Sequence, residues 1–369
     1  MELLRFGVEE EYLLADSVSR VTVARAAAVL TEAGVTLGER AQPEFIATQV
    51  EGCTPPVCTA AELRDALLAV RSVFGVAARR AGCLLVASGT AVLPSVHPLP
   101  VTDWARYRRI AAHVGPGIAD QVGGELGGCH IHVGDLDRPS ALAVQARLRP
   151  WLPVLESVAV NSPFCEGLHT GSSSSRAFRY ANWPTVGPAP VVDGPGYEDW
   201  VEHALAEGIM LDRRSLYWYA RPSEHLPTVE IRMADVNADV DVAVLLAVLL
   251  RGMTHVLLEE LRSGVPDRSG GVTGRRLRAA HDRAAWGGLA GPGVDPVTGC
   301  LRPWREQLGD LVRRATPGLA MYGDLPLAER LAGKLVNGRT GAETQRAVHA
   351  RNGSLAEVVD HLAAATLRG

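Results

Sequence analysis

The 369-residue chain contains almost no lysine, because Lys334 is the only one. The surrounding Gly333-Lys334-Leu335 lacks the glycine-rich lead and the Ser or Thr of a P-loop, and no other lysine could form a Schiff base. Arginine therefore supplies nearly all of the positive charge. The formal net charge of −4 provides no basic surface for nucleic acid or an anionic membrane, so we expect neither as a partner.

The chain also lacks the cysteine spacing of a zinc site or a redox motif. None of its six cysteines forms a C-x-x-C pair, which favours reduced thiols in a cytosolic protein. The N-terminus has no signal-peptide hydrophobic region. The most apolar run, 240–250, is too short to span a bilayer. We therefore expect a soluble protein located in the cytoplasm.

Hydrophobic periodicity and capping signals divide the chain into a sheet-bearing part and a helical part. Extended segments are expected at 3–14, 44–51, 83–88, 129–133, 215–220 and 228–235. Helices are expected at 23–33, 59–80, 103–118, 139–160 (interrupted at Pro150 and Pro153), 197–208, 239–262, 273–286, 302–314, 325–335, 341–351 and 354–366. This order predicts an α+β fold with a mainly antiparallel sheet and a helical C-terminal third. We expect one catalytic domain, 1–369, with the sheet in 1–236 and mostly helices in 237–369.

The strand that contains Gly7-Val-Glu-Glu-Glu-Tyr12 carries an unusual pair of acids. Glu9 and Glu11 are two residues apart, so both point to one face of the strand, whereas Glu10 points to the other. Like charges on one face repel each other unless a cation neutralises them. The alternative is an edge strand with solvated acids. If the strand holds a metal, Glu10 is expected to be the dispensable member of the three.

Three further stretches also alternate polar and apolar residues. His130 and His132 lie on the same face of one predicted strand, and Glu230 and Arg232 lie on the same face of a second. Glu51 lies in a third alternating stretch. Taken singly, such residues are commonly a half-exposed histidine pair, a cross-strand ion pair and a surface acid. If the strands pair in one sheet, however, these side chains form one large polar face, with helices packed on the apolar face.

A polar face of this size is costly unless it is solvated or holds cations and a polyanion that offset the desolvation of its charges. Carboxylates with one imidazole suit Mg²⁺ or Mn²⁺, and the cysteine spacing argues against zinc. In proteins that lack a P-loop, the triphosphate of ATP is usually bound by hard metal ions held beside arginine. The residues alone therefore predict metal–nucleotide chemistry on a sheet face.

Over almost its full length, the chain resembles the bacterial carboxylate–amine ligases of the second glutamate–cysteine ligase family. This family belongs to the wider glutamine synthetase and guanidino kinase fold group. The resemblance is carried by 7–12 (GVEEEY), 49–55 (QVEGCTP), 128–134 (GCHIHVG), 148–153 (LRPWLP), 161–164 (NSPF), 216–232 (LYWYARPSEHLPTVEIR) and 341–346 (GAETQR). Together these motifs are very specific, although each short piece alone is not.

The resemblance implies an ATP-dependent ligase. ATP phosphorylates a substrate carboxylate, and an amine then displaces phosphate from the acyl phosphate to form an amide. By similarity, the metal ligands are Glu9, Glu11, Glu51, His130 and Glu230, with Glu44 as a further candidate. Glu44 lies seven residues before Glu51, which in one continuous strand places it on the opposite face. Arg232 neutralises the γ-phosphate during transfer, and His132 contacts the nucleotide or the acyl group.

Two features near these motifs have open roles. Arg221 follows a predicted strand, where its planar fork suits a substrate carboxylate, but a structural loop arginine is equally compatible. The loop Gly171-Ser-Ser-Ser-Ser-Arg176 is either a lid over the acceptor amine or a mobile surface loop.

Some segments depart from the family pattern. Gly89-Thr90 leads into Ala-Val-Leu-Pro without the usual aromatic residue, and 176–180 lacks a tryptophan. These departures leave open whether the substrates are glutamate and cysteine or the small-molecule acid and amine of a specialised biosynthetic step. A phosphotransferase of guanidino kinase type and a non-catalytic nucleotide-binding relative are the alternatives. The fold group also implies a homo-oligomer.

Overall fold

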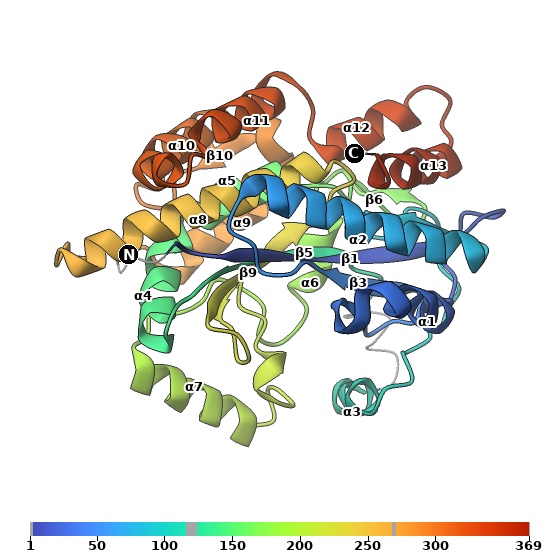
Figure 1. The fold of residues 1–369 in the computed structure, drawn as a ribbon, viewed down its shortest axis with the longest axis horizontal. Helices are drawn as coiled ribbons and strands as arrows, with labels where there is room; N and C mark the ends of the chain where they lie inside the picture. Colours follow the sequence, from blue (N-terminus) through green and yellow to red (C-terminus); the bar gives the residue numbers. More distant parts are fainter. Residues whose placement is uncertain (1–2, 116–123, 268–270, 369) are drawn as a thin grey trace.

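A seven-stranded sheet organises the computed structural model, which describes residues 3–115, 124–267 and 271–368 (Figure 1). The strand order is β2-β3-β1-β5-β9-β8, and β4 pairs with the far end of β1. All of these pairings are antiparallel, which confirms the predicted α+β class. The strands are β1 (Phe6–Asp16), β2 (Ala41–Pro43), β3 (Gln49–Cys53), β4 (Cys83–Val86), β5 (Gly128–Gly134), β8 (Ala220–Pro222) and β9 (Thr228–Asp235).

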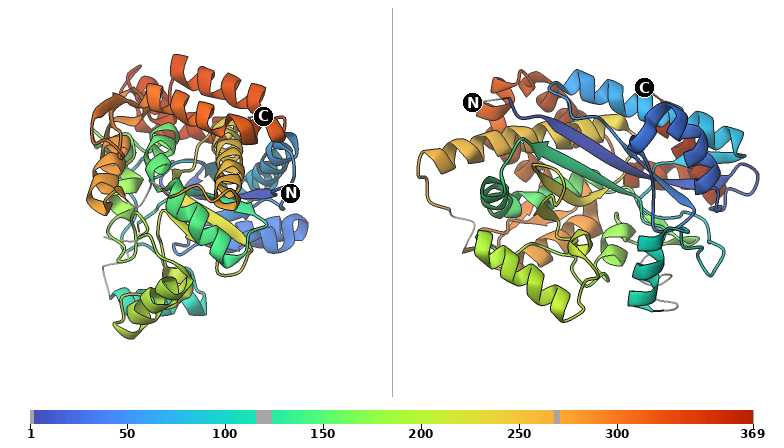
Figure 2. Two further views of the ribbon diagram at one scale, coloured as in Figure 1. Left: turned by 90° about the vertical axis from the view of Figure 1, so that its left-hand side faces the viewer. Right: turned by 60° about the horizontal axis from the view of Figure 1, so that its bottom comes forward.

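Helices cover one face of the sheet, as the sequence predicts. α2 (Ala60–Arg80) and α8 (Val240–Arg262) pack directly on the strands, and α10 (Trp304–Met321) and α11 (Leu325–Asn337) lie outside α8 (Figures 1 and 2). α8 is long and apolar enough to cross a membrane, but 89% of its most apolar window is buried within the protein. Its apolar surface is therefore used for packing against the sheet and the outer helices.

α3 and α7 lie on the opposite side of the sheet, whereas α12 and α13 lie on the same side as α2 (Figure 1). The remaining helices are α1 (Ala26–Leu37), α3 (Ala105–Val114), α4 (Arg138–Leu148), α5 (Leu152–Ala159), α6 (Ser175–Tyr180), α7 (Gly194–Ala206), α9 (Gly274–Gly287), α12 (Gly341–His349) and α13 (Leu355–Thr366). Two small hairpins pair β6 (Phe164–Cys165) with β7 (Leu168–His169) and β10 (Pro292–Val294) with β11 (Leu301–Pro303).

Most predicted helices are present with small shifts at their ends. Thr59 and Glu62 form the expected capping box at the start of α2. α10 continues seven residues past its predicted end at 314, through Pro317. Close packing explains this extension, because Gly318 lies directly against the Gly252 backbone of α8. The end of the predicted helix 103–118 lies partly outside the described residues, and the sequence interpretation missed the β10–β11 hairpin.

Two predicted extended segments are wrong. The segment 44–51 is not one strand, because β2 ends at Pro43, the chain bends, and β3 returns antiparallel to β2. The segment 215–220 is not a strand of the sheet either. The Trp218 and Tyr219 backbones pair with Gly187, and the sheet strand begins only at Ala220. Arg221 consequently lies within β8 rather than in a loop after it.

The largest buried cluster combines residues of β1, β5 and β9 with residues of α8, α10 and α11. The sheet-bearing and helical parts of the chain therefore share packing surface. The assignment of 1–369 to a single catalytic domain stays a prediction.

The dispensability of Glu10 at a metal site stays a prediction, but Glu10 points away from the polar face, as predicted, and belongs to a buried ion pair. Its carboxylate is fully buried and accepts two hydrogen bonds from Arg71, at 2.5 and 2.8 Å, and a third from Tyr12 at 2.6 Å. Arg71 also donates to the carbonyls of Asn237 and Ala238, at 2.7 and 2.8 Å. This ion pair therefore joins β1 and α2 to the segment between β9 and α8.

Glu10→Gln is expected to destabilise the protein by about 3 kcal/mol, since it leaves the Arg71 guanidinium buried without a countercharge. The measurement is the free energy of unfolding in urea. Glu32→Gln is the matched control, because it removes the exposed carboxylate that pairs with Arg80 and should have a far smaller effect. Equal losses in the two variants would contradict the structural role of Glu10.

Candidate active site

A cavity of about 430 Å³ lies over the polar face of the sheet. Its floor is built by the strand register, which places Glu11 beside Glu51, Glu9 beside His130, and His132 beside Glu230. Because strand side chains alternate, the residues between these positions point into the helix-covered core. The nine predicted site residues all line this cavity: Glu9, Glu11, Glu44, Glu51, His130, His132, Arg221, Glu230 and Arg232.

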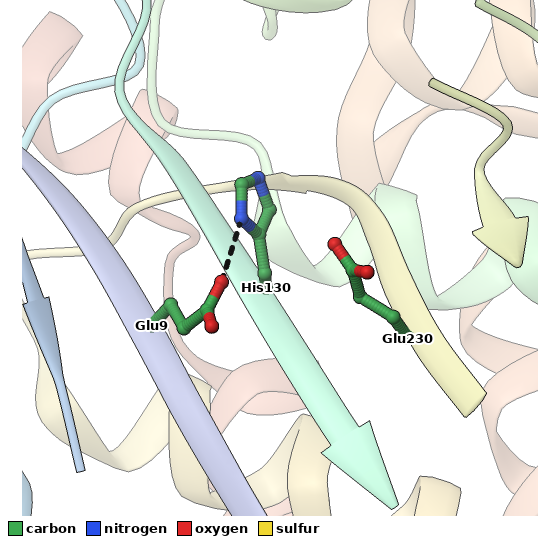
Figure 3. A group of neighbouring side chains, drawn as sticks. All are labelled: Glu9, His130 and Glu230. Atoms are coloured by element: carbon green, nitrogen blue, oxygen red, sulfur yellow. Dashed lines mark hydrogen bonds and ion pairs between the residues drawn. The ribbon is translucent and has the colours of Figure 1, made fainter. Parts of the chain in front are cut away.

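Glu9 is the central acid of the floor. One carboxylate oxygen lies 3.4 Å from Nδ1 of His130, and the other lies 3.3 Å from Nε2 of His132. Figure 3 shows Glu9, His130 and Glu230 projecting from three neighbouring strands toward one side of the sheet. Burial raises the pKa of Glu9, but the charge of His132 and the contacts with both imidazoles outweigh it, so the net pKa is well below normal. Burial and the charge of Arg232 lower the pKa of His130 to about 4, which keeps its imidazole neutral.

The acids on the β2–β3 side repel one another. Burial and the charge of Glu11 raise the pKa of Glu44 to about 7. Burial and the charges of Glu9 and Glu44 raise the pKa of Glu51 well above its usual value. Glu44 lines the cavity because the chain bends between β2 and β3, so the opposite face, which one continuous strand would have given it, does not apply. A bound divalent cation would relieve this repulsion.

The donor set fits a hard divalent cation. One ligand atom each from Glu9, His130 and Glu230 lie within 4.8 Å of one another. Nε2 of His130 is buried and forms no hydrogen bond, and it lies 3.4 Å from a carboxylate oxygen of Glu11, so both atoms are placed to share a cation. Cys53 forms a second group with Glu9 and Glu51, but burial raises the pKa of its thiol, which disfavours the thiolate needed for coordination. Carboxylate oxygens with one neutral imidazole are suited to Mg²⁺ or Mn²⁺.

Arginines occupy the β8–β9 side of the floor. The fork of Arg221 donates to both oxygens of Glu230, at 2.9 and 3.1 Å, and Arg232 also contacts Glu230. The two guanidinium charges overcome the effect of burial and lower the pKa of Glu230 well below normal. Acids therefore lie along β3 and β1, arginines lie along β9 and β8, and Glu230 is held ionised between them.

Sequence reasoning missed two parts of the cavity. One is Arg176, which lines the floor next to Glu11 and follows the serine run. The other is an aromatic wall, defined as six rings that line the cavity: Phe45, Trp104, Tyr107, Tyr180, Trp183 and Tyr217. Neighbouring rings contact each other at centroid distances of 5.4 to 6.2 Å. These residues are distributed from 45 to 217, so only tertiary structure brings them together.

The serine run itself is not exposed. Ser172, Ser173, Ser174 and Ser175 are each at most 5% exposed. The mobile surface loop expected as one alternative is therefore wrong for these residues, which are built into the interior beside β9.

A model of the glutamate–cysteine ligase family 2 matches residues 5–361. The chain belongs to this family. A Salinispora tropica protein, whose name assigns it as a glutamate–cysteine ligase 2, is 39% identical over 368 residues, which cover 99% of this chain and 96% of that protein. Family membership confirms the predicted recognition and makes the chain an ATP-dependent carboxylate–amine ligase.

Two solved structures share the fold. The glutamate–cysteine ligase of Francisella tularensis, solved with AMP, superposes with a TM-score of 0.74 at 11% identity, covering 100% of this chain and 90% of that one. A bifunctional glutathione synthetase from Pasteurella multocida superposes with a TM-score of 0.70 at 13% identity. The match covers 99% of this chain and 52% of that one. At these identities, the similarity supports the fold alone.

Mn²⁺ is predicted to bind the purified protein, with the affinity reduced roughly tenfold or more by Glu9→Gln or Glu51→Gln, since each removes a charged donor. Titration monitored by the electron paramagnetic resonance of free Mn²⁺ measures this affinity. Glu39→Gln is the control, because Glu39 is an exposed acid outside the cavity. Unchanged Mn²⁺ binding in both site variants would contradict the metal assignment.

Proposed function

We propose that this ligase activates a substrate carboxylate as an acyl phosphate and passes the acyl group to an amine. The observation that carries this proposal is the division of one cavity floor into buried acids and buried arginines. A polyanion with bound cations complements such a floor, because the cations meet the acids and the phosphates meet the arginines.

The first step transfers the γ-phosphoryl group of ATP. A substrate carboxylate oxygen forms a bond to the γ-phosphorus, the bond to the β–γ bridging oxygen breaks, and ADP leaves. The second step makes the amide. The amine nitrogen attacks the acyl carbon, the bond from that carbon to the phosphate-bearing oxygen breaks, and inorganic phosphate leaves while the nitrogen releases a proton. Neutralisation of charge and positioning supply most of the catalysis in phosphoryl transfer.

Glu9, Glu11, Glu44, Glu51, His130 and Glu230 are the residues that would hold Mg²⁺ or Mn²⁺. When bound, these cations supply charge neutralisation for the triphosphate. The protein prepares the site by keeping His130 neutral and Glu230 ionised, since a ligand must present a lone pair.

Each remaining site residue has a distinct proposed role. Arg232, on the floor between acids and arginines, would neutralise the transferring phosphoryl group. Arg221 directs its fork at Glu230, so we assign it to orienting that carboxylate instead of gripping a substrate carboxylate. His132 donates to or accepts from Thr228 at 2.9 Å and faces Glu9, from where it would contact the nucleotide or the acyl group.

The aromatic wall lies next to Arg232, since Tyr180 contacts its Nε at 3.4 Å and Tyr217 lies under its guanidinium at 5.7 Å. A substrate group near the transferring phosphate would therefore meet aromatic rings. Glutamate and cysteine are the substrates in the names of the relatives, and a specialised acid or amine with an apolar group is equally compatible with this wall. We further propose that the protein is homo-oligomeric, as the family resemblance implies, and cytoplasmic, as its cysteine spacing indicates.

Hydroxylamine tests the acyl phosphate directly. With ATP, Mg²⁺ and a panel of acids, an acyl phosphate reacts with hydroxylamine to give a hydroxamate, detected by product mass. A guanidino-kinase-type phosphotransferase would instead consume ATP with a guanidino substrate and give no hydroxamate. Omission of each acid in turn identifies the carboxylate, and a second panel of amines then identifies the acceptor.

Arg232→Lys is expected to lower kcat by roughly 100-fold while changing the KM for ATP far less. The reason is that a lysine keeps the charge but cannot reproduce the planar fork that stabilises the transferring group. Steady-state kinetics of phosphate release measure both constants. A control is Arg214→Lys, which changes an exposed arginine at the rim of the cavity. A rise in KM alone would assign Arg232 to ground-state binding.

A further inference from the structure

Arg176 is an unusual member of the cavity floor. β5 contributes no side chain beside Glu11, because Gly128 occupies that position. A Cβ atom on Gly128 would lie 2.4 Å from Nη2 of Arg176 and 2.9 Å from an oxygen of Glu11. The guanidinium of Arg176 therefore lies over the strand in the place that a β5 side chain would fill, next to the acids of the floor.

This guanidinium is buried without a countercharge in hydrogen-bonding contact. Arg176 is 1% exposed, and across 3–115, 124–267 and 271–368 it forms no ion pair. Its Nη atoms donate only to the carbonyls of Met233 and Arg232, over 3.3 and 3.4 Å, and Nε has no partner. The Tyr180 ring lies 4.9 Å from its Cζ. By contrast, Arg221 and Arg232 share the carboxylate of Glu230.

The Arg176 charge acts on the nearby carboxylates of Glu11 and Asp235, whose pKa values it lowers, but neither carboxylate is in hydrogen-bonding contact with it. A buried guanidinium with a free N–H can therefore still take an anion as a direct hydrogen-bond partner. Arg176 lines the cavity, and its hydrogen bond to the Arg232 carbonyl places it beside the arginine proposed to meet the transferring phosphoryl group. Along β9, Arg232 lies between Arg221, which pairs opposite Glu230, and Arg176, which lies near Met233. Arg176 and Arg221 therefore lie on opposite sides of Arg232 along β9, and Arg176 is the one whose guanidinium is not already paired with Glu230.

The serine run holds Arg176 in this place. Ser174 caps α6 and donates to Asp235 at 2.8 Å, while Ser162 donates to the other oxygen of Asp235 at 2.7 Å. The Arg176 amide in turn donates to Ser162 at 3.1 Å. Asp235 is the last residue of β9, so the strand that carries Arg232 also anchors the backbone of Arg176.

The C-terminal motif 341–346 supports the same run from the other side. Arg346, on α12, donates to the Ser172 carbonyl at 2.6 Å and to the Ser173 hydroxyl at 3.2 Å. Gln345 donates to Asn161, whose amide donates to Asp235. Arg346 does not line the cavity, so any effect it has on the reaction must pass through the serine run.

We propose that Arg176 contacts the terminal phosphate of ATP from the side of Arg232 opposite Arg221, and that Arg346 is a positioning residue for it. This inference rests on the proposed use of the cavity floor for the ATP phosphates. Arg176 thus adds a phosphate contact to the site. The motif 341–346 would support that contact indirectly, because Arg346 positions Arg176 through the serine run.

The test compares ATP with ADP, because only ATP carries the terminal phosphate. The full chain is titrated with each nucleotide and Mg²⁺ by calorimetry. Arg176→Gln is expected to weaken ATP binding roughly tenfold to a hundredfold and to leave ADP binding unchanged. Arg283→Gln, which alters an exposed arginine of α9, should change neither. If Arg176→Gln weakens the binding of ATP and of ADP equally, or weakens the binding of neither, the assignment of Arg176 is overturned. If Arg176→Gln does not fold, Arg176→Lys retains the charge without the fork and is expected to show a smaller ATP-selective loss.

A double-mutant cycle tests Arg346 with the same measurement. Arg346→Gln alone should weaken ATP binding selectively, and adding it to Arg176→Gln should produce no further loss, because it acts through Arg176. Arg351→Gln is the control on an exposed arginine just after α12. Additive losses, or no loss in Arg346→Gln, overturn the positioning role. The readout needs no turnover, so a wild-type protein that binds ATP but forms no hydroxamate refutes the proposed function and not this inference.

Discussion

Repulsion among buried carboxylates is the constraint on which this structure depends. Glu9, Glu11, Glu44 and Glu51 lie together at one side of a cavity, and their charges act on one another at low solvent exposure. Such a cluster is compatible with a stable fold if bound cations neutralise the repulsion among the carboxylates during function. Nearby arginines reduce the same repulsion. The antiparallel sheet provides the rigid frame that keeps these charges close without letting the strands separate.

The frame itself is held by a separate set of interactions on the opposite face. The Glu10–Arg71 pair joins β1 and α2 to the segment that follows β9, and α8 fills the apolar core beneath the strands. One strand thus contributes alternate residues to two tasks. Glu9 and Glu11 face the cavity, whereas Glu10 supports the backbone that positions them. Within Glu-Glu-Glu, the outer two residues therefore belong to the candidate active site and the middle residue belongs to the core.

Strand alternation made much of the site predictable from the sequence. Glu9, His130 and Glu230 could be placed on one face because a two-residue period is enough to assign the side of a strand. Family resemblance then supplied the ligase chemistry. The face on which Glu44 lies could not be assigned, since its position depends on a bend between β2 and β3 that periodicity does not reveal. Arg176 was missed because its place over Gly128 depends on buried hydrogen bonds between distant segments, which leave no periodic pattern.

The support that α12 gives to the serine run has a consequence for the order in which the site can form. The acids of β1 precede Gln345 and Arg346 by more than three hundred residues, so they are synthesised well before α12. A nascent chain can form the central strands before α12 exists. It still lacks the hydrogen bonds from Arg346 to the serine run that precedes Arg176. The cavity floor therefore reaches its final arrangement only after α12 has been synthesised, and a chain that ended before α12 would present the acids without the braced Arg176.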